Sequence, residues 1–263
     1  MEERIRIMKQ KQTAAVLSQR EMATDIYDMW IRTSLARDAA PGQFLCIYPK
    51  DRSTLLPRPI SICEVDADRT ALRIVYRAAG AGTREFSGYT KGDDIFVLGN
   101  LGNGFPLREG RGKRVFLIGG GIGIPPMLEL AKRLDADKRI LLGYRDGELF
   151  LKEDLEKYGA VYVATEDGSA GTRGNVLDAV AENNLEADMI FACGPMPMLR
   201  AVKAYGESHR IPAYISLEER MACGVGACLG CVARTVKTDH HSHVNNARIC
   251  TDGPVFEAQD VDI

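Results

Sequence analysis

Four cysteines lie close together in the C-terminal part of the chain, in the order Cys223-x4-Cys228-x2-Cys231-x18-Cys250. The first three have the spacing of plant-type [2Fe-2S] ligands, and a cluster of two irons and two bridging sulfides needs four thiolates. The whole chain holds seven cysteines, an odd number that argues against a disulfide framework. These four residues are therefore predicted to ligate a [2Fe-2S] cluster.

Glycines separate the first three of these cysteines, at Gly224, Gly226 and Gly230. A side chain at such positions would collide with a cluster, and a glycine backbone turns freely enough to aim N–H groups at sulfur. A structural zinc site is the alternative, although zinc sites favour paired CxxC spacing. The spacing and the glycines together favour the cluster.

Two short motifs further upstream suit a flavin nucleotide. In the run from Arg58 to Ser61, the arginine can bind a phosphate through paired hydrogen bonds, and the serine can reach an isoalloxazine edge. Gly80 and Gly82 let backbone N–H groups approach a pyrophosphate, with the Thr83 hydroxyl as a further donor. Each motif alone also fits a strand entry or a hairpin turn, so FAD is inferred from their joint presence. The predicted contacts are Arg58, Pro59, Ile60, Ser61, Val75, Tyr76, Arg77, Gly82 and Thr83.

A glycine-rich turn indicates a second nucleotide site. The strand RVFLIGG runs into Gly121-Ile122-Gly123 and then into Pro125-Pro126, which reads as strand, turn and helix start. The match to G-x-G-x-x-G is poor, and a turn without a ligand is the alternative. A later strand ends at Cys193, at the carboxyl edge where open α/β sheets bind ligands, although this cysteine also suits a buried core position. The predicted NAD contacts are Gly120, Gly121, Ile122, Gly123, Cys193, Gly194 and Pro195.

The elements that must position these residues fall into three segments. Six short apolar or alternating runs between residues 10 and 108 predict an antiparallel β-barrel. Between residues 112 and 210, apolar strands alternate with stretches of helical period, which predicts a parallel sheet with crossover helices. We expect an FAD-binding β-barrel domain at 1–110, an NAD-binding α/β domain at 111–212 and a [2Fe-2S] cluster-binding segment at 213–263.

Composition limits the classes of partner. The 34 basic and 36 acidic residues give a net charge of −2 without a long run of either sign, which argues against nucleic acid or an anionic membrane surface. The N-terminus lacks the apolar core of a secretory signal, and no apolar stretch is long enough to span a membrane. We therefore expect a cytoplasmic protein. His240, His241 and His243 are interpreted as solvated rather than as metal ligands.

The motifs occur in an order that resembles the ferredoxin-reductase superfamily, which implies FAD in the barrel and NAD(P) in the α/β domain. Within it, the run from Glu219 to Cys231, together with Cys250, the run GPVF at 253–256 and the run LGNGF at 101–105, is similar to the electron-transfer subunit of class 1B dihydroorotate dehydrogenase. This resemblance implies a heterotetramer with two FMN-containing catalytic subunits, which oxidise dihydroorotate in pyrimidine biosynthesis. The present chain would then relay electrons through [2Fe-2S] and FAD to NAD+.

Other readings stay open at this point. A self-contained oxygenase reductase is disfavoured, because the segment after Pro212 is too short for a full ferredoxin fold. A related subunit of a hydrogenase or of a ferredoxin-NADP transhydrogenase would share both domains, although the transhydrogenase relatives are expected to carry aspartate where Cys223 stands. A regulatory iron–sulfur sensor is the non-enzymatic alternative. No catalytic acid or base is assigned, since dihydroorotate chemistry is expected in the partner.

Two further expectations concern specificity and assembly. Glu166 and Asp167, after the third strand of the α/β domain, are candidates for contact with the nucleotide ribose. Met221, Val225 and Leu229 surround the cysteines and are expected to be exposed in an interface with the partner, with inward packing over the cluster as the alternative.

Overall fold

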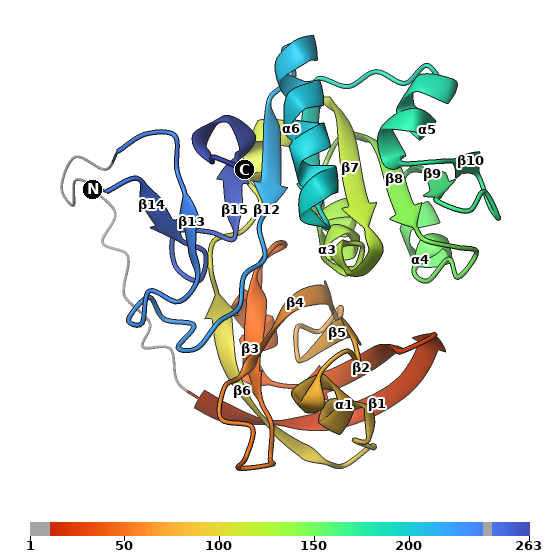
Figure 1. Cartoon of the computed structure of the whole chain (residues 1–263). Coiled ribbons are helices and arrows are strands. Elements are labelled where there is room, and N and C mark those ends of the chain that lie inside the picture. Colours follow the sequence, from red (N-terminus) through yellow and green to blue (C-terminus); the bar gives the residue numbers. More distant parts are fainter. Residues whose placement is uncertain (1–10, 239–243) are drawn as a thin grey trace.

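The computed structural model describes residues 11–238 and 244–263. Figure 1 shows a barrel below, a sheet with helices above, and the C-terminal segment beside the two. The histidines that the sequence analysis interprets as solvated, His240, His241 and His243, lie outside the described residues.

Six antiparallel strands close into a barrel in the order β1-β2-β5-β4-β3-β6, which confirms the predicted architecture. Side chains along the strands point alternately into the barrel, where those such as Ile31, Leu45 and Ile74 are buried, and outward, where most of those on β3 and β5 are covered by the rest of the fold. The strands are β1 (Lys11–Ala23), β2 (Ile26–Arg32), β3 (Phe44–Tyr48), β4 (Arg58–Val65), β5 (Ala71–Arg77) and β6 (Asp94–Leu101). Two short helices connect barrel strands, η1 (Ser34–Asp38) and α1 (Ala81–Ser87), and a third, α2 (Leu107–Gly110), lies between β6 and the first strand of the sheet.

A seven-stranded sheet follows, in the order β10-β9-β8-β7-β11-β12-β15. All of its pairings are parallel except that between β12 and β15. The strands are β7 (Arg114–Gly120), β8 (Asp137–Tyr144), β9 (Ala160–Thr165), β10 (Thr172–Arg173), β11 (Met189–Cys193), β12 (Ala213–Ser216) and β15 (Val255–Glu257). The helices are η2 (Gly121–Gly123), α3 (Pro125–Arg133), α4 (Lys152–Glu156), α5 (Val176–Glu182) and α6 (Met196–His209).

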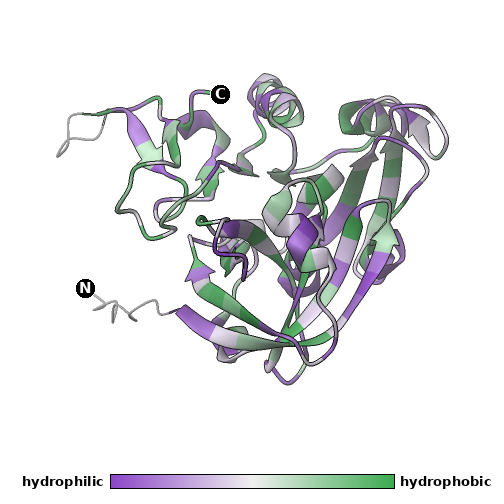
Figure 2. Ribbon diagram, turned by 60° about the horizontal axis from the view of Figure 1, so that its bottom comes forward, coloured by the Kyte–Doolittle hydropathy of each residue, from purple (hydrophilic) through white to green (hydrophobic). Residues whose placement is uncertain are grey.

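Both faces of this sheet are covered, which explains its nearly continuous apolar strands. On β7, Val115 and Leu117 pack in one cluster with residues of α3 and α4, whereas Phe116 and Ile118 pack in another with residues of α5 and α6. Figure 2 shows the difference in pattern: the sheet strands are mostly hydrophobic, and the long barrel strands alternate in hydropathy.

The C-terminal segment is built around a two-stranded sheet of β13 (Val232–Arg234) and β14 (Asn246–Arg248). Its last part returns to the larger sheet, because β15 pairs with β12 and a short helix, η3 (Ala258–Asp260), follows. Strand β12 therefore belongs to the seven-stranded sheet, although the range expected for the cluster segment begins with it. Among the described residues, no helix is long and apolar enough to cross a membrane.

Candidate functional site

A cavity of about 860 Å³, called the central cavity below, lies where the barrel, the sheet and the C-terminal segment meet. The barrel contributes residues 58–61 of β4 and residues 75–77 of β5. Ile122 of the glycine turn and residues 216–221, which follow β12, complete the wall. One space thus touches both predicted nucleotide motifs and the segment that leads into the first cysteine.

Arg58 and Gly82 come from different elements and meet beside the central cavity. Arg58 begins β4, and a methyl group added at Gly82, in the first turn of α1, would lie 2.9 Å from Nε of Arg58. One of the Arg58 donors, Nη1, binds the Leu56 carbonyl oxygen at 2.6 Å. A guanidinium held over a glycine backbone forms a cradle that a larger residue at position 82 would fill, and this arrangement fits a nucleotide phosphate.

Replacing Arg58 by alanine is expected to weaken FAD retention by about 1.5–3 kcal/mol, or one to two decades in affinity, because a charge-assisted phosphate contact is lost. Titration of the purified variant with FAD measures this change. Arg84→Ala is the matched control. It removes an exposed arginine of α1, the helix that carries Gly82, and should retain FAD. Equal affinity in both variants would place the phosphate elsewhere.

Two of the predicted flavin residues have side chains that are already engaged. The Tyr76 hydroxyl donates to Gln19 Oε1 at 2.7 Å inside the barrel, where the ring also packs edge-on against Phe86. The Thr83 hydroxyl oxygen accepts the Gly80 N–H at 3.1 Å and so caps α1. The same hydroxyl donates to the Gly80 carbonyl oxygen at 3.1 Å, so it is not the free donor that the sequence analysis expects. Main-chain atoms of these two residues therefore remain the groups available to a cofactor.

The glycine turn packs directly against the end of β11. A methyl group added at Gly123 would lie 2.3 Å from the Cys193 carbonyl oxygen, and one added at Gly194 would lie 3.1 Å from the Gly120 nitrogen. The turn and the Cys193-Gly194-Pro195 motif therefore form one surface at the carboxyl edge of the sheet, the edge where open α/β sheets bind ligands. Burial raises the pKa of the Cys193 thiol well above its ordinary value, so this side chain is a neutral thiol.

Glu218 is a wall residue of the central cavity that the sequence analysis does not single out. It stands two residues beyond β12, and its neighbour Ser216 ends that strand beside Cys193. Surrounding protein atoms raise the pKa of the Glu218 carboxyl, although its surface stays accessible through the cavity. An acidic residue two positions after a parallel strand is the sequence signal that could have identified it.

The carboxylate of Asp167, a predicted candidate for ribose contact, accepts hydrogen bonds from both the N–H and the hydroxyl of Ser169.

The loop after Cys223 aims backbone N–H groups at sulfur. Those of Val225, Ala227 and Cys228 lie 3.5, 3.3 and 3.4 Å from Cys223 Sγ. Burial raises the pKa of Cys223, but these N–H groups outweigh it and lower the pKa to about 6. A thiolate at neutral pH is the form that binds iron, and N–H groups around the sulfurs are typical of iron–sulfur sites. The loop therefore fits a cluster.

Positive φ angles make this loop possible. Gly224 and Gly226 have φ of +67° and +82°, in the left-handed region where glycine is favoured. A methyl group at Gly224 would lie 3.0 Å from Cys46 Sγ, and one at Gly226 would lie 2.9 Å from Thr251. Glycine is thus needed at these positions because the loop packs closely against β3 and the C-terminal segment. The sequence analysis gives a different reason, the collision of a side chain with a cluster.

The cysteines of the loop differ in exposure. Cys231 and Cys250 are buried, whereas Cys228 is exposed. Val225 and Leu229 are exposed by 45% and 61%, as predicted for an interface. Met221 is buried, so its predicted exposure is wrong: it packs into the core beside the central cavity.

The barrel and the cluster segment are also joined directly. Asn103, in the LGNGF run, donates from Nδ2 to the Val255 carbonyl oxygen at 2.7 Å and accepts the Val255 N–H at 3.0 Å. Its own N–H binds the Gly253 carbonyl oxygen at 2.6 Å. Two of the runs that carry the family resemblance, LGNGF and GPVF, therefore contact one another in the fold.

The barrel and the parallel sheet share the central cavity, and the cysteine loop begins directly after the residues 216–221 that line it. Together these features define a ferredoxin-reductase-type oxidoreductase with an iron–sulfur segment. A solved NADH-dependent reduced ferredoxin-NADP oxidoreductase has the same fold, with a TM-score of 0.84 and 28% identity over 95% of this chain and 89% of that chain. The ferredoxin reductase of carbazole 1,9a-dioxygenase shares the fold at a TM-score of 0.67 and 20% identity, over 80% and 70% of the two chains.

The particular family follows from sequence comparison. The iron–sulfur cluster binding domain of dihydroorotate dehydrogenase B matches residues 218–262, and the oxidoreductase NAD-binding domain matches residues 117–204. The dihydroorotate dehydrogenase B (NAD(+)) electron transfer subunit of Bacillus velezensis is 44% identical to this chain, over 94% of this chain and 96% of the relative. That of Shouchella clausii is 40% identical, over 97% of this chain and 99% of the relative. The chain belongs to this family of electron transfer subunits. It is an NAD-linked oxidoreductase subunit that uses FAD and a [2Fe-2S] cluster.

Proposed function

We propose that this chain relays electrons between NAD(H) and an FMN-containing dihydroorotate dehydrogenase catalytic subunit, in a heterotetramer of two copies of each. The observation that carries the proposal is the central cavity. It brings residues of the barrel, the glycine turn and the segment before Cys223 to one space, which supports three redox sites in close succession. FAD, when bound, supplies the exchange between two-electron hydride chemistry and single electrons.

The chain's own residues would bind and orient in this process. Arg58 and the backbone at Gly82 would hold the flavin pyrophosphate, and residues 59–61 and 75–77 would line the isoalloxazine. The glycine turn at 120–123 and the Cys193-Gly194-Pro195 motif would hold the dinucleotide. The four cysteines predicted as ligands would hold the cluster: Cys223, Cys228, Cys231 and Cys250.

The same sites suggest a division of the chain. We assign FAD binding to residues 1–110, NAD binding to 111–212 and cluster binding to 213–263, with β12 and β15 as the strands by which the last segment joins the sheet. Cluster ligands thus come from a segment that contacts both other units. This supports a cluster placed within reach of the flavin and of an external partner.

Exposed apolar residues support the position of that partner. Val225 and Leu229 of the cysteine loop are accompanied by Leu55 and Leu56, exposed by 82% and 51% in the loop before β4. Leu56 also lines the central cavity. Apolar surface of this kind beside redox sites suits a stable protein interface, and electron transfer demands close approach.

The proposal predicts that the isolated chain oxidises NADH with a dye acceptor but does not oxidise dihydroorotate. Addition of the FMN-containing catalytic subunit from the same cell should form a complex and produce NADH from dihydroorotate and NAD+. Spectrophotometry at the NADH band and size-exclusion chromatography measure both results. Dihydroorotate turnover by the chain alone, or no association, would contradict the proposal.

The similarity to the NADH-dependent reduced ferredoxin-NADP oxidoreductase favours one second candidate, electron exchange with a ferredoxin. Reduced ferredoxin offered to the isolated chain with NAD+ or NADP+ separates the two functions. Fast ferredoxin-dependent reduction of either nucleotide without the catalytic subunit would favour this candidate.

A further inference from the structure

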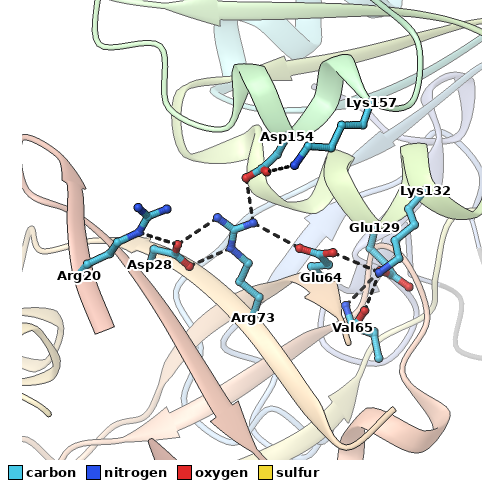
Figure 3. A network of polar contacts seen from close by, with 9 residues as sticks. All are labelled: Arg20, Asp28, Glu64, Val65, Arg73, Glu129, Lys132, Asp154 and Lys157. Carbon is cyan, nitrogen blue, oxygen red and sulfur yellow. Dashed lines mark hydrogen bonds and ion pairs between the residues drawn. The ribbon is translucent and has the colours of Figure 1, made fainter. Parts of the chain in front are cut away.

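A buried polar network joins the barrel to the α/β unit at Arg73 (Figure 3). Arg73 on β5 binds Asp28 of β2 through two hydrogen bonds of 2.8 and 3.0 Å, and Nη1 reaches Asp154 of α4 at 2.9 Å. Its side chain is only 7% exposed, and that of Asp28 5%. The contact with Asp154 is thus a charged bond from the covered outer face of the barrel to the other unit.

A second contact lies beside the first, between β4 and α3 (Figure 3). Lys132 of α3 donates to Glu64 at 3.1 Å and to the Val65 carbonyl oxygen at 2.7 Å. The Val65 N–H donates to Glu129 of α3 at 3.0 Å. Glu64 also accepts from Arg73 at 3.3 Å, so both contacts form one network.

Two elements of this network, β4 and α3, carry or directly follow proposed cofactor residues. β4 carries Ser61 three residues before Glu64, which corresponds to about 10 Å along a strand. α3 begins directly after the glycine turn, and Lys132 lies nine residues after Gly123, or about 13 Å along a helix. The network therefore sits a short distance behind both proposed sites, on the rigid elements that connect them.

Buried ion pairs contribute little to net stability compared with apolar packing, because desolvation offsets their attraction. Their bonds are directional, however, and an arginine fork fixes its partner in distance and angle. Hydride transfer is sensitive to such geometry, since a misplacement of about 1 Å can cost a hundredfold in rate. A network at this position suits control of alignment better than a gain in stability.

We propose that Arg73 and Asp154 are positioning residues that set the alignment of the nicotinamide site with the flavin site. Lys132 supports them through β4 and α3. Each nucleotide site would form without the network, but the distance between the nicotinamide site and the flavin site would no longer be fixed. The inference rests on the proposed function, because it assumes hydride exchange between these two sites.

Asp154→Asn in the full chain, loaded with FAD and its cluster, tests this. It removes the charge that Arg73 meets on α4 and leaves Arg73–Asp28 intact. We expect the dissociation constant for NAD+, measured by calorimetry, to stay within about threefold, while flavin reduction by NADH in stopped flow slows about tenfold. Hydrogen exchange at the Val65 amide, which donates across the contact, should become faster.

Lys157→Met is the matched control. Lys157 donates to the same carboxylate at 2.8 Å, but from the residue that directly follows α4 in the same unit, so its loss leaves the bond between the two units in place. This variant should reduce flavin at the unaltered rate. Asp154→Asn combined with Lys132→Met weakens both contacts, leaving the Val65–Glu129 hydrogen bond, and should slow reduction about a hundredfold with FAD content unchanged.

Three results would overturn the inference. Equal reduction rates in Asp154→Asn, Lys157→Met and the unaltered chain would show that the network does not set alignment. A parallel loss of NAD+ binding and rate would show local damage to the nucleotide site instead. If the unaltered chain binds NAD+ but its flavin is not reduced by NADH, the proposed function itself fails, and the inference with it.

Discussion

Cys228→Ser is expected to yield protein without iron–sulfur absorbance whose FAD is still reduced by NADH. The unaltered chain should carry about one FAD and two irons, and serine at one of four ligand positions removes a thiolate that the cluster needs. Cys228 is the exposed cysteine of the loop, so its replacement disturbs no core packing. Hydride exchange uses the barrel and the sheet and does not require the cluster. Metal analysis and visible absorbance measure the first effect, and stopped-flow reduction the second.

Cys63→Ala serves as the control for this experiment. Cys63 is a buried cysteine of β4 in the apolar core shared by the barrel and the sheet, so its replacement should leave the iron content unchanged. Transfer from dihydroorotate to NAD+ in the reconstituted complex should be abolished only in Cys228→Ser. Full iron content in Cys228→Ser, or zinc in place of iron in the unaltered protein, would contradict the cluster assignment.

A second large effect is expected from Gly123→Ala. The added methyl group would lie 2.3 Å from the carbonyl oxygen of Cys193, and a backbone atom cannot move aside as a flexible side chain can. The glycine turn and the end of β11 must then separate, at a cost of about 3 kcal/mol, which corresponds to about two decades in NAD(H) affinity. NAD+ titration by calorimetry measures the loss, while FAD and iron contents should stay at their normal levels.

Gly147→Ala is the matched glycine replacement in the same unit. A methyl group at Gly147 would meet its nearest neighbour, Ser169, at 3.4 Å, an ordinary contact. This variant should bind NAD+ as the unaltered protein does. Equal binding by both variants would move the dinucleotide away from the glycine turn.

Local patterns were sufficient to predict the elements and the motifs. Alternation along the barrel strands and the apolar runs of β7, β8, β9 and β11 each arise from neighbours in sequence, and so does the cysteine spacing. The Pro125-Pro126 pair marks the start of α3 for the same reason. Features of this kind depend on the residue types at fixed short distances, which the sequence displays directly.

Contacts between distant segments could not be read in this way. The Tyr76 hydroxyl binds Gln19, 57 residues away, and Met221 turns into the core, because of neighbours that only the fold supplies. Arg73 looks like an ordinary surface residue of an alternating strand, yet its partners Asp28 and Asp154 lie 45 and 81 residues away. Such pairings depend on how barrel and sheet pack, which no local pattern encodes.

The pairing of β15 with β12 has a consequence for how the protein matures in the cell. Cys250 lies between β14 and β15: the pairing of β14 with β13 brings it beside Cys231, and the pairing of β15 with β12 fixes the same segment to the sheet. During synthesis, the barrel and all parallel strands leave the ribosome before Cys250 does. The complete set of four predicted ligands therefore exists only after these parts have been synthesised. If iron is not supplied, we expect a folded flavoprotein that oxidises NADH but cannot pass the electrons to its partner.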